Sequence, residues 1–190
     1  MEYQEIMRYP VTSVIIAINI IVFALVNFKA IGVDRLGSSY METIQNRQLY
    51  RVVSSAFTQR EVMHLACNMY SLYNIGTTLE YALNSGLYAL CYVVIMISGG
   101  LVSARLHKKG SPFTLSIGAS GVICGLLGIY MVIAYSVFGF GGLKSLIPTI
   151  VLLAAMTTSK KIDSIGHFTG LEAGIICGIV LVNVYAFGYQ

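Results

Sequence analysis

The stretch SIGASGVICGLLG, residues 116–128, places small residues at the head of a long apolar run. Its four glycines and two serines leave little side-chain bulk around Ser120. Residues that follow it are hydrophobic enough to form a membrane-spanning helix. A helix that begins with so few large side chains is typical of one whose backbone packs closely against a neighbour in lipid. The stretch therefore indicates a helical membrane protein with a polar residue at the head of a packed helix.

The composition of the whole chain agrees with a membrane protein. Of the 190 residues, 56% are hydrophobic and 11% are charged, and the mean hydropathy is +0.76, which exceeds the range of ordinary soluble domains. The net charge of +4 is small and scattered, so we exclude nucleic acid as a partner and expect the lipid bilayer instead. The four cysteines lie in apolar runs without a CxxC pair, which indicates buried thiols rather than disulfides. We expect no metal and no cofactor.

Six stretches approach the length of about 20 mostly apolar residues that a spanning helix needs. They are predicted to start near Val11, Met63, Leu87, Ala119, Lys144 and Ile165. The second stretch is the most polar and must be buried among the other helices, because lipid does not tolerate its side chains. The fifth is short and contains Pro148, which favours a tilted or loosely packed helix.

The connection between the first two stretches, residues 29–62, is much longer than the others. Connections of this length are usually functional or structured, so we expect it to fold at the membrane interface. The chain shows no internal repeat and no flexible linker. The sequence therefore predicts one all-α domain over residues 1–190, a polytopic six-transmembrane-helix bundle with a structured first loop.

Polar side chains occur at the start of the second, fourth and sixth predicted helices. They are His64 and Asn68 on the second, Ser120 on the fourth and His167 on the sixth. Even-numbered helices all begin on the same side of a membrane, so these four side chains share one face of the bilayer. Intramembrane polar groups are costly unless they are paired or face water. The shared depth therefore predicts a single functional site.

Glycines recur on the fourth and sixth helices at helical spacing, at Gly121, Gly125 and Gly128 and at Gly166, Gly170, Gly174 and Gly178. At 100° per residue, the second stripe lies on the same face as His167. If the two stripes pack together, the hydroxyl of Ser120 and the imidazole of His167 can form a nucleophile and base pair. His64 and Asn68, with the backbone at Gly118, could then donate hydrogen bonds to an oxyanion.

Each of these residues also has a purely structural interpretation. Ser120 among glycines is typical of helix packing or capping. The imidazole of His167 could simply donate a hydrogen bond to a backbone carbonyl group. His64 and Asn68 stand four residues apart on one helix face and could form an interhelical hydrogen-bonded pair.

Four other ionisable residues are expected to take no part in chemistry. Glu80 and Glu172 are expected to have structural roles, and Glu172 lies about 140° from His167 around the helix. Asp163 precedes His167 by four residues and is interpreted as a helix cap. His107, in the segment RLHKKG, is expected to be solvated.

Three motifs resemble those of the rhomboid family of intramembrane serine proteases. They are HLACN at 64–68, GASG at 118–121 and GHFTGLEAG at 166–174, and the likeness extends to Tyr50, Arg51, Gly76 and Glu80. The resemblance implies a Ser120–His167 dyad without an acid and an oxyanion hole from His64, Asn68 and the backbone. The sequence departs from the family where Tyr50 replaces a tryptophan, Gln59 a histidine and Cys124 an aromatic residue.

The resemblance implies an intramembrane endopeptidase that cleaves membrane-anchored proteins, and it favours a bacterial plasma membrane. Neither HExxH nor GxGD, the motifs of other intramembrane proteases, occurs in the chain. A non-catalytic protein that binds transmembrane segments is the alternative.

Ten of the twelve Lys and Arg residues lie on the active-site side, which predicts a cytoplasmic site. The resemblance implies the opposite, and we expect the site to open to the extracytoplasmic side. The sequence identifies neither the substrate nor the oligomeric state.

Overall fold

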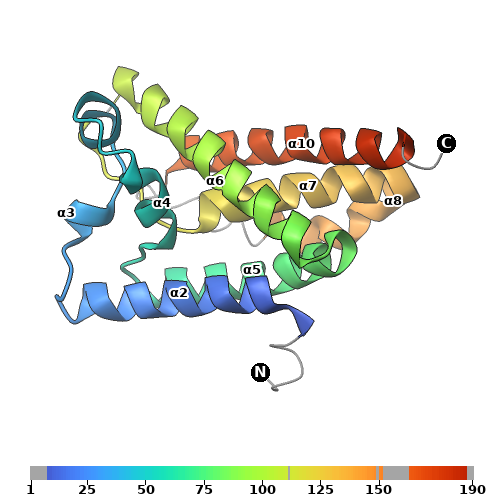
Figure 1. Ribbon diagram of the computed structural model, residues 1–190, viewed down its shortest axis with the longest axis horizontal. Helices are drawn as coiled ribbons and strands as arrows, with labels where there is room; N and C mark the ends of the chain where they lie inside the picture. Colours follow the sequence, from blue (N-terminus) through green and yellow to red (C-terminus); the bar gives the residue numbers. More distant parts are fainter. Residues whose placement is uncertain (1–7, 111, 149, 152–162, 188–190) are drawn as a thin grey trace.

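The computed structural model describes residues 8–110, 112–148, 150–151 and 163–187 of the chain (Figure 1). Five long helices dominate it: α2 (Pro10–Asn27), α5 (Val62–Leu83), α6 (Ser85–Leu106), α7 (Ser120–Phe138) and α10 (Ser164–Phe187). Each begins within two residues of a start predicted from the sequence. The only β-type pairing among the described residues is an isolated antiparallel bridge between Ser38 and Ser116. The all-α class is therefore confirmed.

Four of these helices, α2, α6, α7 and α10, are long and apolar enough to cross a membrane. Helix α5 is equally long but more polar, and it packs between α2 and α7, as its buried polar side chains require. The chain is therefore a multi-pass membrane protein. The predicted fifth span, from Lys144, lies largely outside the described residues; α8 (Phe140–Leu143) precedes it, and the short 3₁₀ turn η3 (Lys144–Leu146) covers its first three residues.

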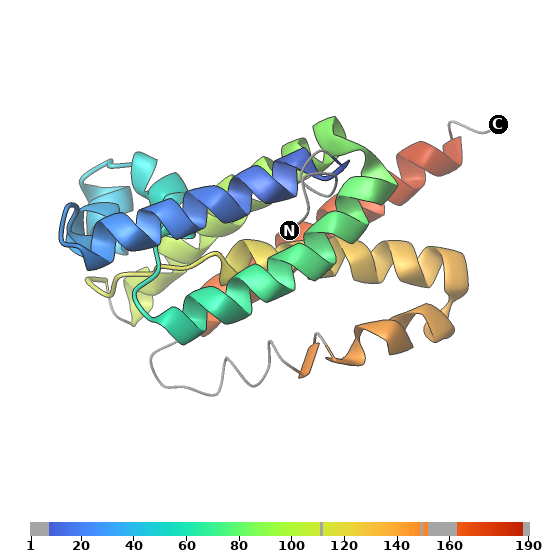
Figure 2. The same cartoon turned by 90° about the horizontal axis from the view of Figure 1, so that it is seen from below.

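Helices α7 and α10 lie side by side in both views (Figures 1 and 2) and form the tightest contact of the bundle. A Cβ atom added to Gly174 would lie 1.8 Å from the carbonyl oxygen of Gly125, and one added to Gly170 would lie 2.0 Å from that of Gly121. Only glycine allows the two backbones to approach this closely. Figure 1 shows α6 crossing over this pair, where Gly99 meets the backbone of Gly170.

Helices α2 and α5 form the other half of the bundle, and Glu80 of α5 holds the start of α2. Its carboxylate accepts hydrogen bonds from the backbone N–H groups of Val11 at 3.0 Å and Thr12 at 2.8 Å, and from the hydroxyl of Ser85 at 2.7 Å. The first N–H groups of a helix lack intrahelical partners, and a carboxylate there is favoured by the helix dipole. The expected structural role of Glu80 is therefore confirmed.

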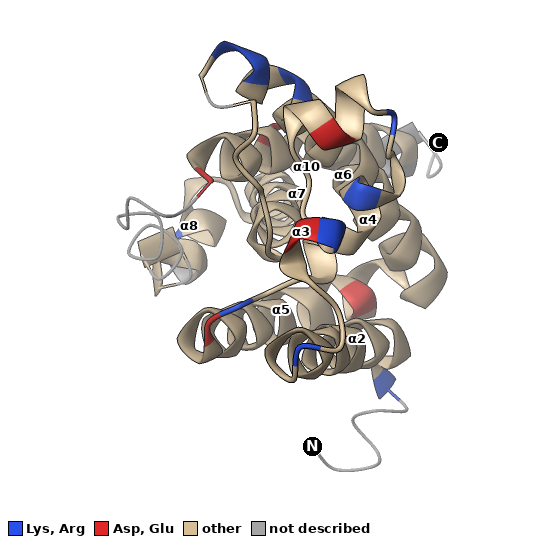
Figure 3. Ribbon diagram, turned by 90° about the vertical axis from the view of Figure 1, so that its left-hand side faces the viewer, with Lys and Arg blue, Asp and Glu red and all other residues tan. Residues whose placement is uncertain are grey.

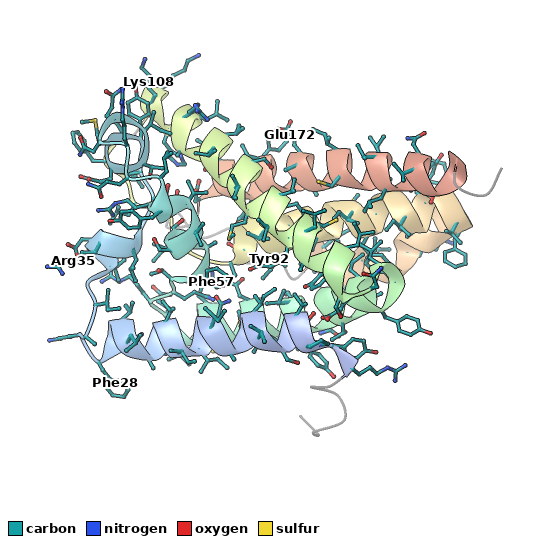
Figure 4. The ribbon with its side chains drawn as sticks, in the orientation of Figure 1. Phe28, Arg35, Phe57, Tyr92, Lys108 and Glu172 are labelled. Atoms are coloured by element: carbon teal, nitrogen blue, oxygen red, sulfur yellow. The ribbon has the colours of Figure 1, made fainter. Side chains whose placement is uncertain are left out.

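The long first connection is folded, as predicted. It contains α3 (Val33–Leu36), the π-helical turn η1 (Tyr40–Gln45) and α4 (Tyr50–Phe57). The buried Arg51 joins these pieces, because its guanidinium donates to the carbonyl oxygens of Asp34 and Gly37 and to the side chain of Gln48. Phe57 of α4 packs on Tyr92 of α6, with ring centroids 6.4 Å apart (Figure 4). Figure 3 looks onto this end of the molecule, where basic residues, blue on the ribbon, lie around the loop.

Candidate active site

Ser120 and His167 face each other across the contact between α7 and α10. Ser120 is the first residue of α7, and His167 lies in the first turn of α10. Because both helices begin at the same end of the bundle, the two side chains lie at the same depth. The Oγ atom of Ser120 and the Nε2 atom of His167 are 2.6 Å apart. Both residues are at most 9% exposed, so water competes little for this hydrogen bond.

Among the described residues, no third side chain hydrogen-bonds to the imidazole of His167. Nδ1 of His167 is buried and has no hydrogen-bond partner within the described part of the chain. Asp163 lies one helical turn earlier, and its carboxylate accepts from the backbone N–H of Gly166 at 2.9 Å instead. This is the geometry of a helix cap, as the sequence predicted. The arrangement is that of a nucleophile beside a base, without an acid.

A cavity of about 70 Å³ opens beside the two side chains, between α4, α6 and the starts of α7 and α10. One water requires roughly 10–15 Å³, so several can enter. Gly121 and Gly170 contribute bare backbone to the wall, and Ser103, Ser116 and Asp163 contribute polar side chains. The cavity therefore offers room for several water molecules at the head of two membrane helices.

Gly118 shapes the backbone in front of Ser120. Its φ of +123° disfavours any residue with a side chain, and a Cβ there would lie 3.1 Å from Cε1 of His64 and 3.5 Å from Oγ of Ser120. Its N–H donates to the carbonyl oxygen of Ser55 at 2.9 Å, so in this conformation that N–H is not open to a substrate. The N–H of Ser120 itself, at the first position of a helix, has no intrahelical partner.

His64 and Asn68 differ in their surroundings although they share one face of α5. His64 lies against Gly118 near the hydroxyl of Ser120, and its Nε2 is buried without a partner among the described residues. Asn68 lies one turn deeper, and its amide donates to the side-chain oxygen of Gln59 at 2.8 Å. Gln59 in turn donates to Asn19 of α2 at 3.0 Å. The structure thus places His64, but not Asn68, against Gly118 in front of Ser120.

Two side-chain arrangements could not be found from the sequence. Gln59 and Asn19 are fully buried and hold Asn68 in place, yet no spacing in the chain links them. The expectation that His107 is solvated is wrong, because the ring is 8% exposed and its Nε2 lies 3.2 Å from Asp163. The turn after α6 directs this ring toward the start of α10, where a carboxylate offsets its burial.

Comparison with known proteins places the chain in a family. The model of the rhomboid domain matches residues 46–184, a range that holds α4 of the first loop and the side chains of His64, Ser120 and His167. The chain belongs to the rhomboid family. It is 29% identical to the RHOMBOID-like protein 5 of Arabidopsis thaliana over 82% of this chain and 51% of the relative.

Two further relatives of this rhomboid are named as proteases. The rhomboid protease GluP of Bacillus subtilis is 28% identical over 90% of this chain and 34% of its own length. The rhomboid-like protease 3 of Toxoplasma gondii is 26% identical over 74% of this chain and 54% of its own length. The chain spans about half the length, or less, of these relatives.

Two of the residues considered from the sequence, Cys124 and Glu172, do not line the cavity in this rhomboid. Cys124 is buried in the apolar core, one turn after Ser120. Glu172 is exposed on the outer face of α10 and points away from the bundle (Figure 4). Neither side chain is hydrogen-bonded to the imidazole of His167, whose Nδ1 has no partner among the described residues and whose Nε2 meets Ser120.

Proposed function

We propose that this rhomboid is an intramembrane serine endopeptidase that cleaves the transmembrane segments of membrane-anchored proteins. The observation that carries the proposal is the 2.6 Å contact between Oγ of Ser120 and Nε2 of His167, at the edge of a cavity. Two relatives whose names describe them as proteases support the same activity.

In this mechanism Ser120 is the nucleophile and His167 is the general base. Oγ of Ser120 attacks the carbonyl carbon of the scissile peptide bond while Nε2 of His167 takes the hydroxyl proton. The imidazolium then gives this proton to the leaving amine nitrogen, which leaves an acyl-enzyme ester on Ser120. Water from the cavity loses a proton to His167 and attacks the ester. The ester C–O bond then breaks and the imidazolium returns the proton to Oγ of Ser120, which releases the acid product and restores the hydroxyl.

The oxyanion that forms in both steps requires preorganised donors. Nε2 of His64 suits this role, because it is buried near Oγ of Ser120 and has no partner among the described residues. The N–H of Ser120 supplies a backbone donor. Asn68 projects from the same face of α5. One N–H of its amide donates to Gln59, and the second N–H is the one that can donate to the oxyanion. Gly118 contributes the open backbone conformation.

The substrate segment must leave its helical form at the cavity. Irregular backbone persists at membrane depth only where protein or water satisfies its polar groups, and the polar wall of the cavity provides such partners. We place the active-site end on the extracytoplasmic face of a bacterial plasma membrane. The positive-inside rule would instead make this side cytoplasmic, because ten basic residues lie on it. Half of those ten residues belong to the folded first loop (Figure 3), for which the rule is weak.

The test combines a serine-directed fluorophosphonate probe with cleavage of a single-pass substrate in proteoliposomes. We expect wild-type protein to label and to cleave, and Ser120→Ala and His167→Ala to abolish cleavage while the protein stays folded. Ser136→Ala, at the far end of the same helix, is the matched control and should cleave normally.

Substantial cleavage by either dyad variant would refute the mechanism. If folded wild-type protein neither labelled nor cleaved, but bound transmembrane segments, the chain would be a non-catalytic member of the family.

A further inference from the structure

Asp163 joins three segments of the chain at the wall of the cavity. Its carboxylate accepts hydrogen bonds from the hydroxyl of Ser116, in the loop before α7, and from the N–H of Gly166 in α10 at 2.9 Å. From the end of α6 it meets Nε2 of His107 at 3.2 Å and the hydroxyl of Ser103 at 3.5 Å. A single side chain thus holds together the segments that surround the two dyad residues.

The hydrogen bond between Asp163 and Ser116 links the same two segments as the dyad. Ser116 lies four residues before Ser120, and Asp163 lies four residues before His167. The same two segments are therefore joined twice, once by the dyad and once by this second hydrogen bond. Ser116 is itself fixed, because its backbone exchanges two hydrogen bonds with Ser38, at 2.7 and 3.0 Å.

The helical turn between Asp163 and His167 is held on two sides. Asp163 caps it, because its side chain binds the N–H of Gly166 and its carbonyl oxygen binds the N–H of His167 at 3.2 Å. On the other side, a Cβ added to Gly121 would lie 3.1 Å from the carbonyl oxygen of Gly166. Any shift of Asp163 therefore moves the backbone from which the imidazole of His167 projects.

His107 holds the carboxylate of Asp163 in this position. Its Nδ1 meets the carbonyl oxygen of Ser103 at 2.8 Å while its Nε2 meets Asp163. The ring therefore bridges the end of α6 and the carboxylate of Asp163. The ring and the carboxylate are largely buried, where an unpaired charge is costly. The pair therefore resists displacement of either partner.

We propose that Asp163, held by His107 and Ser116, is a positioning residue that sets the imidazole of His167 against the hydroxyl of Ser120. This inference rests on the proposed protease activity. Asp163 does not contact the imidazole and is not part of the chemistry. It acts through the first turn of α10, so its loss changes the geometry of the dyad rather than the binding of substrate.

The primary test is Asp163→Asn, because asparagine is an equally good helix cap but carries no charge to hold His107. A displacement of 1 Å at a reacting group can cost about 100-fold in rate. We expect kcat for the proteoliposome substrate to fall at least about tenfold with KM unchanged, since a partial displacement suffices. The rate of fluorophosphonate labelling at Ser120 should fall in parallel, because it needs the same geometry.

Three further variants make the test independent of folding. Glu80→Gln is the matched control, since Glu80 is also a buried carboxylate that caps a helix, at the far end of α5 from His64. It should lower stability but leave kcat unchanged. Ser116→Ala should lower kcat, and Ser116→Thr should restore it by keeping the hydroxyl.

The outcomes separate this inference from the proposed function. Inert wild-type protein would overturn both. Active wild-type protein with full kcat in folded Asp163→Asn would overturn the positioning role alone, as would an equal loss of kcat in Glu80→Gln. If Asp163→Asn does not fold, the two Ser116 variants decide. Equal kcat in Ser116→Ala and Ser116→Thr overturns the inference. A lower kcat in Ser116→Ala that is recovered in Ser116→Thr supports it.

Discussion

Replacing Gly174 with alanine should force α7 and α10 apart where they are closest. The new Cβ would lie 1.8 Å from the carbonyl oxygen of Gly125 and 2.5 Å from its carbonyl carbon. Carbon–oxygen contacts between packed helices lie at about 3.3 to 3.6 Å, so the two backbones must separate by about 1.5 Å. Both opposing atoms belong to the backbone, so no side-chain rotation relieves the clash.

This displacement reaches the dyad because α10 moves as a rigid helix. Gly174 lies two turns beyond His167, or about 10 Å along the axis. A shift of about 1.5 Å would stretch the 2.6 Å contact between Ser120 and His167 beyond hydrogen-bonding distance. Misplacement on this scale costs about 100-fold in rate. Overpacking also lowers the free energy of unfolding by about 1–3 kcal/mol.

The assay measures kcat in proteoliposomes and thermal unfolding in detergent for a graded set of glycine variants. Gly174→Ala should show the largest fall in kcat and in thermal stability. Gly128→Ala, whose Cβ would lie 2.7 Å from a backbone oxygen, should show a smaller fall in both. Gly141→Ala is the control, because a Cβ in α8 would meet nothing within 4 Å. If Gly174→Ala cleaved and unfolded like Gly141→Ala, the close packing of α7 on α10 would not set the dyad.

Three further results are expected. Asn68→Ala should lower kcat by about 10²- to 10³-fold with little change in KM, whereas a rise in KM alone would favour the interhelical-pair interpretation. Arg51→Ala should lower the free energy of unfolding by about 1–3 kcal/mol, because the half-buried carbonyl oxygen of Asp34 and the buried one of Gly37 lose their donor; unchanged thermal unfolding in detergent would contradict this. Phe113→Cys, at an exposed position beside the active-site end, should react with an impermeant thiol reagent in intact cells after the native cysteines are replaced. Protection would instead place this end in the cytoplasm.

The starts of the long helices were predictable because the bilayer imposes a local rule. A spanning helix needs about 20 apolar residues whatever it packs against, so the starts of α2, α6, α7 and α10 follow from hydropathy, while α5 follows from a stretch of similar length that is more polar. The spacing of the glycines was also readable, since helical periodicity fixes which residues share a face. That periodicity and the shared side of the membrane were enough to select Ser120 and His167 as a candidate pair.

The partners of the buried polar side chains were not predictable from the chain. The sequence suggested a solvated His107, whereas the structure pairs this ring with Asp163, and nothing in the sequence indicated that the Asn68 amide also donates to Gln59. A hydrogen bond depends on the distance and angle between two atoms, and side chains far apart in sequence reach that geometry only when the helices pack. The sequence by itself determined the membrane class, the helix starts and the residues available for chemistry. Only the tertiary structure decided which of those residues meet, because the orientation of each donor is set by neighbours that no local pattern encodes.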